Sequence, residues 1–144
     1  TIKQVRYQTW RSLIHGSRGL IYFVHQFQPR FTEHALLDDS EMLAAVTATH
    51  KQIREIAPLL NQNKGVFRDS GGIETLTLTS PAGTYILAAS TTNGMAKLTL
   101  PAPPRGGTVS VLGENRTLQR SGAVFTDTFG PEDAHLYRIV VGPE

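Results

Sequence analysis

The side chains in this sequence that are best suited to bind a ligand lie directly after its most apolar run. The run ends at Val24 and is followed by His25, Gln26 and Phe27, with Gln28, Arg30, Glu33 and His34 close behind. This polar and aromatic cluster is either a rim that contacts a substrate or a solvated loop. We expect substrate contact for His25 and Gln26, which are nearest to the run, and solvent exposure for Arg30, Glu33 and His34.

Other kinds of active centre find little support in the sequence. His25 and His34 fit no short zinc motif, and no carboxylate or thiol completes a set with them. The chain has no Cys, which excludes disulfides and thiol catalysis. It has no Gly-x-Ser-x-Gly nucleophile motif, and Asp69-Ser70-Gly71 is better explained as a turn. We therefore expect no metal and no cofactor.

The sequence also shows no pair of carboxylates placed for glycoside hydrolysis. Hydrolysis of a glycosidic bond needs two carboxylates about 5–10 Å apart. The 12 acidic residues include no pair at the end of a recognisable strand, and Asp38 and Asp39 are better explained as charges at a helix N-terminus. We expect no catalytic residue within this chain.

A helix and a strand precede the cluster. Apolar residues recur at helical spacing over residues 2–15, and Gly16 is a plausible stop. Residues 20–25 read as a short strand that is apolar on both faces, which is typical of parallel sheets. The sequence offers no second unit of this kind, so the simplest interpretation is the C-terminal end of a larger protein. In barrels of eight parallel strands and helices, the residues after a strand face the active site, and His25 and Gln26 occupy that place.

The cluster continues into a long loop and a second helix. The loop at 26–39 exceeds the 2–6 residues usual after such a strand, and loops of this length are typically functional or disordered. The helix covers residues 40–60, with Pro58 and Asn61 marking its end. On its apolar face, His50 is expected to be a packed, hydrogen-bonded residue.

After residue 65 the apolar period changes from about 3.6 to 2 residues, which is typical of strands. Strands are expected at Ile73–Thr79, Tyr85–Ala89, Ala96–Leu100, Thr108–Leu112, Arg116–Gln119, Ala123–Thr128 and Leu136–Val141, separated by turn signals such as Pro103-Pro104-Arg105-Gly106-Gly107. Such spacing indicates an antiparallel β-sandwich. The predicted fold class is α+β, with a helix–strand–helix unit at 1–62 and a β-sandwich domain at 66–144.

The alternating residues of these strands give an expected core. Ten side chains should point mostly inward: Leu76, Leu78, Leu87, Leu98, Leu100, Val109, Val111, Phe125, Tyr137 and Ile139. The hydroxyl of Tyr137 should have a hydrogen-bond partner. We expect Tyr85, Phe125, Phe129 and Tyr137 to pack in the core and not to form an exposed row that stacks on sugars.

Composition restricts the partners. The net charge is +2, and Arg and Lys are scattered without a basic block, which argues against a nucleic-acid partner. No apolar run approaches the roughly 20 residues of a membrane span, so we expect no membrane partner and a soluble protein. The lack of Cys leaves the compartment open, secretion included.

Residues 6–23 resemble the last barrel unit of retaining glycoside hydrolases with a (β/α)8 catalytic domain. Those enzymes often show Arg-x-x-x-Trp/Tyr-x-x-Leu-x-x-Gly-Ala-x-Gly-Ile-x-Tyr-Phe across a helix and the eighth strand. The matching positions here are Arg6, Trp10, Leu13, Gly16, Gly19, Tyr22 and Phe23, with Ser17 where the pattern has Ala. Residues 53–60 resemble the next helix, and residues 125–139 resemble the closing strands of the β-sandwich appended to such barrels.

The resemblance implies a parent protein that cleaves glycosidic bonds, with the remainder of the barrel and a carbohydrate substrate as partners. The family's two catalytic carboxylates would precede Thr1, and His25, Gln26 and Phe27 would border the sugar subsite. Two alternatives stay open. One is a non-catalytic carbohydrate- or protein-binding sandwich with a helical extension, and the other is an accessory domain that only braces a barrel.

Overall fold

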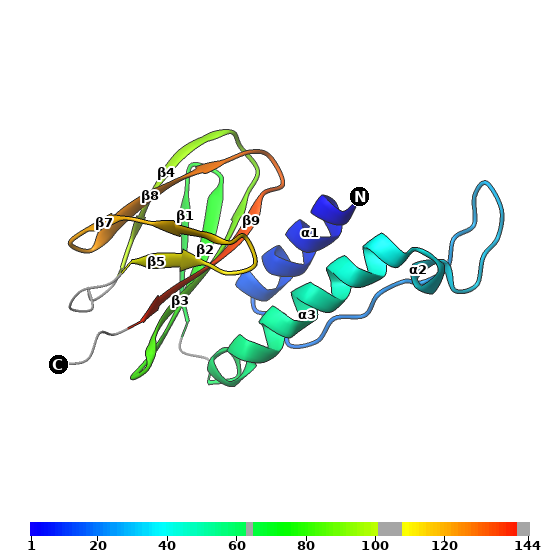
Figure 1. Cartoon of the computed structure of the whole chain (residues 1–144), viewed down its shortest axis with the longest axis horizontal. Helices are drawn as coiled ribbons and strands as arrows, with labels where there is room; N and C mark the ends of the chain where they lie inside the picture. The colour runs from blue at the N-terminus through cyan, green and yellow to red at the C-terminus, as the bar shows by residue number, and fades with distance from the viewer. Residues whose placement is uncertain (63–64, 101–107, 141–144) are drawn as a thin grey trace.

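The computed structural model describes residues 1–62, 65–100 and 108–140. Helices α1 (Ile2–Ile14) and α3 (Ser40–Leu60) pack together against one face of a β-sandwich. The short helix α2 (Ala35–Asp38) precedes α3, and the loop before it projects beyond the end of α3, away from the sandwich (Figure 1).

Both long helices begin at side chains that cap them. The Thr1 hydroxyl accepts a hydrogen bond from the Gln4 backbone, and the Gln4 side chain bonds back to Thr1, which makes a capping box. The Asp39 carboxylate accepts from the Met42 backbone N–H at 2.9 Å. The helices predicted over residues 2–15 and 40–60 are confirmed, but Pro58 lies inside the last turn of α3, which continues to Leu60.

The strand expected at residues 20–25 is wrong for this structure. The segment has no strand partner among the described residues, and only a single bridge, between Gln26 and Thr32, follows it. A strand is defined by its ladder of backbone hydrogen bonds, and none of the described residues supplies a neighbouring strand. The segment is therefore a connection without ladder bonds between α1 and α2.

The second half forms two antiparallel sheets. The strands are β1 (Val66–Ser70), β2 (Ile73–Ser80), β3 (Gly83–Ser90), β4 (Gly94–Thr99), β5 (Val109–Val111), β6 (Arg116–Leu118), β7 (Arg120–Ser121), β8 (Val124–Phe129) and β9 (Ala134–Val140). One sheet has the order β1-β2-β3-β9-β5-β6, and the other has the order β4-β8-β7. The α+β fold with an antiparallel sandwich is confirmed.

All seven expected strands are present within a few residues of their predicted bounds, and two further strands were missed. β1 and β7 lack the alternation that identifies a half-buried strand, since every residue of β1 is exposed. The expected turn at 103–107 and the end of the last strand at Val141 lie outside the described residues.

Two cores share the larger sheet. The core between the sheets contains seven of the expected inward residues: Leu98, Leu100, Val109, Val111, Phe125, Tyr137 and Ile139. Leu76, Leu78 and Leu87 belong to the second core, which lies between the sheet and the helices and is centred on Trp10, Leu13 and Ile56. Phe125, Phe129 and Tyr137 are fully buried, so the prediction of core packing holds for these three aromatic rings.

Arg6 and Trp10 connect the helices to the larger sheet. The Arg6 side chain donates to the Ala134 carbonyl at 3.1 Å and to the Gln52 side chain at 2.8 Å, and its guanidinium lies 5.3 Å from the Trp10 ring centre. Burial lowers the pKa of Arg6. Gln52 in turn donates to the Leu112 carbonyl at 2.8 Å, so one polar chain connects α1, α3 and two parts of the sheet.

A buried ionic group ties the two sheets together. Arg116 on β6 binds both Asp127 oxygens on β8 at 2.8 Å, and the Tyr137 hydroxyl donates to the same carboxylate at 2.8 Å, as expected for that hydroxyl. Glu114 bridges Arg116 and His135. Burial opposes ionisation of Asp127, but the hydrogen bonds from Arg116 and Tyr137 outweigh it and lower the pKa of that carboxyl.

Replacing Phe125 by Ala should destabilise the fold by about 3–5 kcal/mol, because the ring is fully buried and packs edge-on against Tyr137. The measurement is urea unfolding followed by Trp10 fluorescence. Phe67→Ala is the matched control, since that ring is half exposed, and it should cost much less. Equal losses for the two variants would contradict the assignment of Phe125 to the core.

Replacing Asp127 by Asn should lower the free energy of unfolding at neutral pH by about 1–3 kcal/mol, because it removes charge-assisted hydrogen bonds from Arg116. The folded-state pKa of Asp127 is lowered, so its contribution is present above the ordinary carboxyl range and is lost as the pH falls through the folded value. The variant should therefore lose less stability on acidification than the parent. Asp38→Asn, at an exposed position, should leave both quantities unchanged.

Candidate functional site

The candidate site is the connection from Leu20 onward, whose side chains alternate between two environments. Leu20, Tyr22 and Val24 are partly buried toward the helices, whereas Ile21, Phe23 and His25 are exposed. This period of two residues is the pattern of an extended chain with one covered face. The connection thus has the two-faced character of a strand although it lacks the ladder of one.

Tyr22 fixes the covered face. Its hydroxyl lies 3.2 Å from the Thr9 hydroxyl of α1 and 3.1 Å from Nε2 of His50 on α3. One phenol thus bonds to both helices, and Leu20 packs against the core beneath them. The expectation that His50 is a packed, hydrogen-bonded residue is confirmed. Sequence reasoning missed the role of Tyr22, which the alternation starting at Leu20 could have indicated.

A hairpin closed by Gln26 and Thr32 follows; it contains Gln26 and Phe27, and His25 lies directly before it. Gln26 and Thr32 exchange backbone hydrogen bonds of 2.9 and 2.8 Å. Nδ1 of His25 lies 2.6 Å from the Glu33 carbonyl, which can only accept, so this nitrogen carries the proton in the neutral ring. Nε2 of His25 is then the atom left to face a ligand.

Aromatic rings cover the exposed side of this hairpin. Phe27, the third predicted site residue, has its ring centre 5.8 Å from that of Phe23 and 5.8 Å from that of Phe31. His25 lies beside Phe23 at 5.3 Å and beside Phe31 at 6.1 Å. The structure therefore brings His25, Gln26 and Phe27 together, and it adds Phe23 and Phe31, which sequence reasoning did not single out. Arg30, Glu33 and His34 are exposed beside them.

The apolar face formed by these rings is exposed to solvent. Phe23, Phe27 and Phe31 are 72%, 65% and 57% exposed, and Ile21 is fully exposed. Contiguous apolar surface of this kind marks an interaction site in most soluble proteins. Ile21–Leu37 is called the apolar segment below. Its imidazole, amide and rings can bind and orient a ligand, and it carries no carboxylate pair that could break a bond.

Two further observations concern the described residues as a whole. They contain no group of three or more His, Asp or Glu side chains arranged to hold a metal ion. None of their helices is both long enough and apolar enough to cross a membrane.

Solved structures with the same fold are carbohydrate-active enzymes. The α-amylase of Geobacillus thermoleovorans, complexed with acarbose, aligns over 96% of this chain with a TM-score of 0.63 and 15% identity. A β-L-arabinopyranosidase of Geobacillus stearothermophilus, in complex with arabinose, aligns over 99% with a TM-score of 0.64 and 13% identity. An Anoxybacillus α-amylase aligns over 74% with a TM-score of 0.55 and 17% identity. No protein-family model and no curated protein sequence matches the chain.

The chain spans only 24–33% of the length of these enzymes. Its fold is that of the C-terminal part of amylase-like barrel glycoside hydrolases, as the resemblance of residues 6–23 implied. At this level of identity the likeness establishes the fold alone.

The isolated chain should self-associate through the apolar segment. Replacing Ile21 and Phe23 together by Lys should shift it toward monomer, because the change places two charges on the uncovered face. The measurement is sedimentation velocity over a range of concentrations. Met95→Lys is the control, since Met95 is equally exposed but lies in the sandwich. A stable monomer with residues 20–25 strongly protected from hydrogen exchange would favour the self-contained binding module.

Proposed function

We propose that this chain is the C-terminal part of a glycoside hydrolase, in which residues 1–62 form the last unit of a (β/α)8 barrel and residues 66–144 form a sandwich that braces it. The observation that carries the proposal is the two-faced connection at residues 20–25. Its covered face packs against two helices, its other face exposes apolar side chains, and none of the described residues supplies a neighbouring strand. Parallel strands on either side would pair with its backbone, and the barrel that they close would cover the exposed side chains.

The alternation also suggests which side chains would line the barrel. Barrel strands turn one face toward the helices and the other toward the barrel axis. Tyr22 points to the helices, so Ile21, Phe23 and His25 would point inward, with His25 at the carboxyl end. That end is where substrates bind in such enzymes. This supports a position for His25, Gln26 and Phe27 at the border of a sugar subsite.

The bracing role is supported by the contacts of α1. Arg6 and Trp10, two residues of the resembling pattern, lie in the interface between this helix and the sandwich. Leu13, the next residue of the pattern, also belongs to that core, as does its neighbour Ile14. A helix fixed on one side to the sandwich and on the other to the connection through Tyr22 would hold the last barrel strand in a defined place.

The neighbours and the site support the substrate class that we propose. The solved structures with this fold bind acarbose and arabinose in their complexes, and a carbohydrate is the substrate that we propose here. Exposed rings beside a hydrogen-bonding imidazole and amide suit a sugar, which offers hydroxyl groups and apolar ring faces. The catalytic carboxylates would come from residues outside 1–144.

The test uses the longer protein that the upstream reading frame would encode. Replacing His25 by Ala in that protein should lower kcat/KM on its glycoside at least tenfold, the effect of losing about 1.4 kcal/mol of transition-state stabilisation. His34→Ala is the matched control, because His34 is exposed a few residues away, and it should leave kcat/KM unchanged. The 144-residue chain alone should show no turnover of aryl glycosides.

Two outcomes would overturn the proposal. One is turnover by the isolated chain that a single internal Asp or Glu substitution abolishes. The other is an upstream frame without further barrel units, which would favour a binding module. Equal effects of the His25 and His34 substitutions would remove His25 from the sugar site while leaving the barrel assignment intact.

A further inference from the structure

A second uncovered feature lies at the opposite side of the molecule, between the edges of the two sheets. It is a groove of about 350 Å³ that runs between β4 and the pair β1–β2. All six residues of β4, Gly94–Thr99, line it. Because neighbouring residues of a strand point to opposite faces, lining by six in succession means that the groove follows the edge of the strand.

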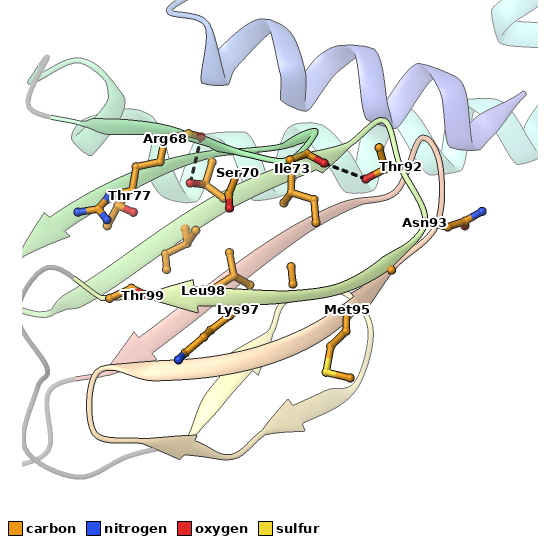
Figure 2. Close-up of a pocket in the computed structure, with 15 residues that line it drawn as sticks. Arg68, Ser70, Ile73, Thr77, Thr92, Asn93, Met95, Lys97, Leu98 and Thr99 are labelled. Carbon is orange, nitrogen blue, oxygen red and sulfur yellow. Dashed lines mark hydrogen bonds between the residues drawn. The ribbon is translucent and has the colours of Figure 1, made fainter.

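The roof of the groove is one face of β1 and β2. The register places Arg68 opposite Thr75 and Ser70 opposite Ile73, and these side chains share the face that looks toward β4. Figure 2 shows Ser70, Ile73 and Leu98 between the strands, whereas Lys97 and Met95 lie on the other side of β4. β1 and β2 therefore overhang the edge of the smaller sheet.

β4 is an edge strand whose outer side has no strand partner among residues 1–62, 65–100 and 108–140. Among the described residues it pairs only with β8. An edge strand presents unpaired N–H and C=O groups at the spacing of a ladder. With a free backbone edge on one side and an overhanging sheet face above, the groove has the shape of an empty place for one more strand. Its length is about 20 Å, since β4 has six residues.

The lining also indicates the charge of an occupant. Arg68 and Lys97 are its ionisable residues, and no carboxylate or aromatic ring is among the described residues that line it. Neither cation forms an ion pair with a described carboxylate. Thr75 and Thr77 turn hydroxyl-bearing side chains to this face, although the alternation of β2 predicted that its leucines would point into the sandwich.

We propose that the groove binds an extended peptide segment with acidic side chains, which adds to β4 as an antiparallel or parallel strand. Main-chain hydrogen bonds to β4 would supply affinity, and the two cations would supply selectivity. Adjacent residues of the segment point to opposite faces, so one acidic residue meets Arg68 under the roof and its neighbour meets Lys97 outside. Like charge disfavours a second copy of this chain, because each copy would bring its own Arg68 and Lys97.

The absence of aromatic rings separates this groove from a sugar site. Ring faces are the surfaces on which sugars stack, and none lines the groove among the described residues. The backbone edge of β4 instead matches the repeat of another polypeptide. The proposal is independent of the barrel and of the glycosidase assignment, since no residue of the apolar segment takes part.

The test uses the 144-residue chain, tethered at low density on a biosensor so that molecules cannot associate. The probe is a peptide of about ten residues, mostly valine and threonine, with two adjacent glutamates at its centre. We expect saturable binding. Methylating all backbone nitrogens of the probe should abolish binding, because either edge of the extended probe can face β4 and both edges then lose the N–H groups that donate to it. A probe with lysines in place of the glutamates should bind at least tenfold more weakly.

Variants of the chain locate the site. Arg68→Glu and Lys97→Glu should each weaken binding about tenfold, which corresponds to about 1.4 kcal/mol. Lys51→Glu is the matched control, since Lys51 is exposed on α3 far from the groove, and it should leave binding unchanged. All three positions are exposed, and near-ultraviolet circular dichroism of Trp10 checks that each variant keeps the fold.

Four results would overturn the proposal. They are no saturable binding up to about 1 mM probe, undiminished binding of the methylated probe, and equal effects of the Lys51 and Arg68 substitutions. The fourth is a different occupant. If the chain binds maltoheptaose and Arg68→Glu abolishes this binding, the groove is an oligosaccharide site. If the free chain associates with itself and Lys97→Glu changes this association, two β4 edges pair with each other.

Discussion

The central strands of the larger sheet, β3 and β9, are buried on both faces, and the rest of the structure depends on that constraint. β3 and β9 send alternate side chains into the core between the sheets and into the core beneath the helices. A strand in this position cannot leave either face in water without exposing a row of apolar side chains. The helices and the smaller sheet are thus both required to cover one six-stranded sheet, and Trp10 and Phe125 are the largest side chains that do so on its two sides.

This arrangement makes α1 a shared element. Its inner residues complete the core against the sheet, while Thr9 reaches the connection through Tyr22. The helix therefore contacts both the sandwich and a segment that has no ladder among the described residues. The hydrogen bonds from Arg6 to Gln52 and from Gln52 to Leu112 fix the rotation of α1 about its axis as well as its contact with the sheet. Such a design suits a domain whose task is to hold a neighbouring segment in place.

The two uncovered surfaces differ in chemistry. The apolar segment exposes rings and aliphatic side chains, and the free energy gained by covering it is mainly hydrophobic. The groove beside β4 exposes backbone groups, hydroxyls and two cations, so its occupant must satisfy hydrogen bonds and charge. We propose other strands of a barrel as the cover of the first surface and a single acidic strand as the occupant of the second. Separate experiments therefore test the two proposals.

The sequence by itself determined the elements with strong local signals. The helices follow from their 3.6-residue period, with acidic residues at the start of the second, and seven strands follow from alternation and turns, because these signals act between near neighbours. It also placed His25, Gln26 and Phe27 in one segment and indicated a resemblance that the solved structures support for the fold.

Tertiary structure alone decided which core each strand face serves. Alternation shows that Leu76 and Leu78 share a face, but both faces of β2 have a neighbour, and only the packed helices assign the leucines to Trp10 and the threonines to the groove. The pairing of Arg116 with Asp127 and the open edge of β4 likewise arise from residues far apart in the chain. Residues 20–25 show the same limit, because a strand needs neighbours, and local sequence specifies an extended chain without specifying what it pairs with.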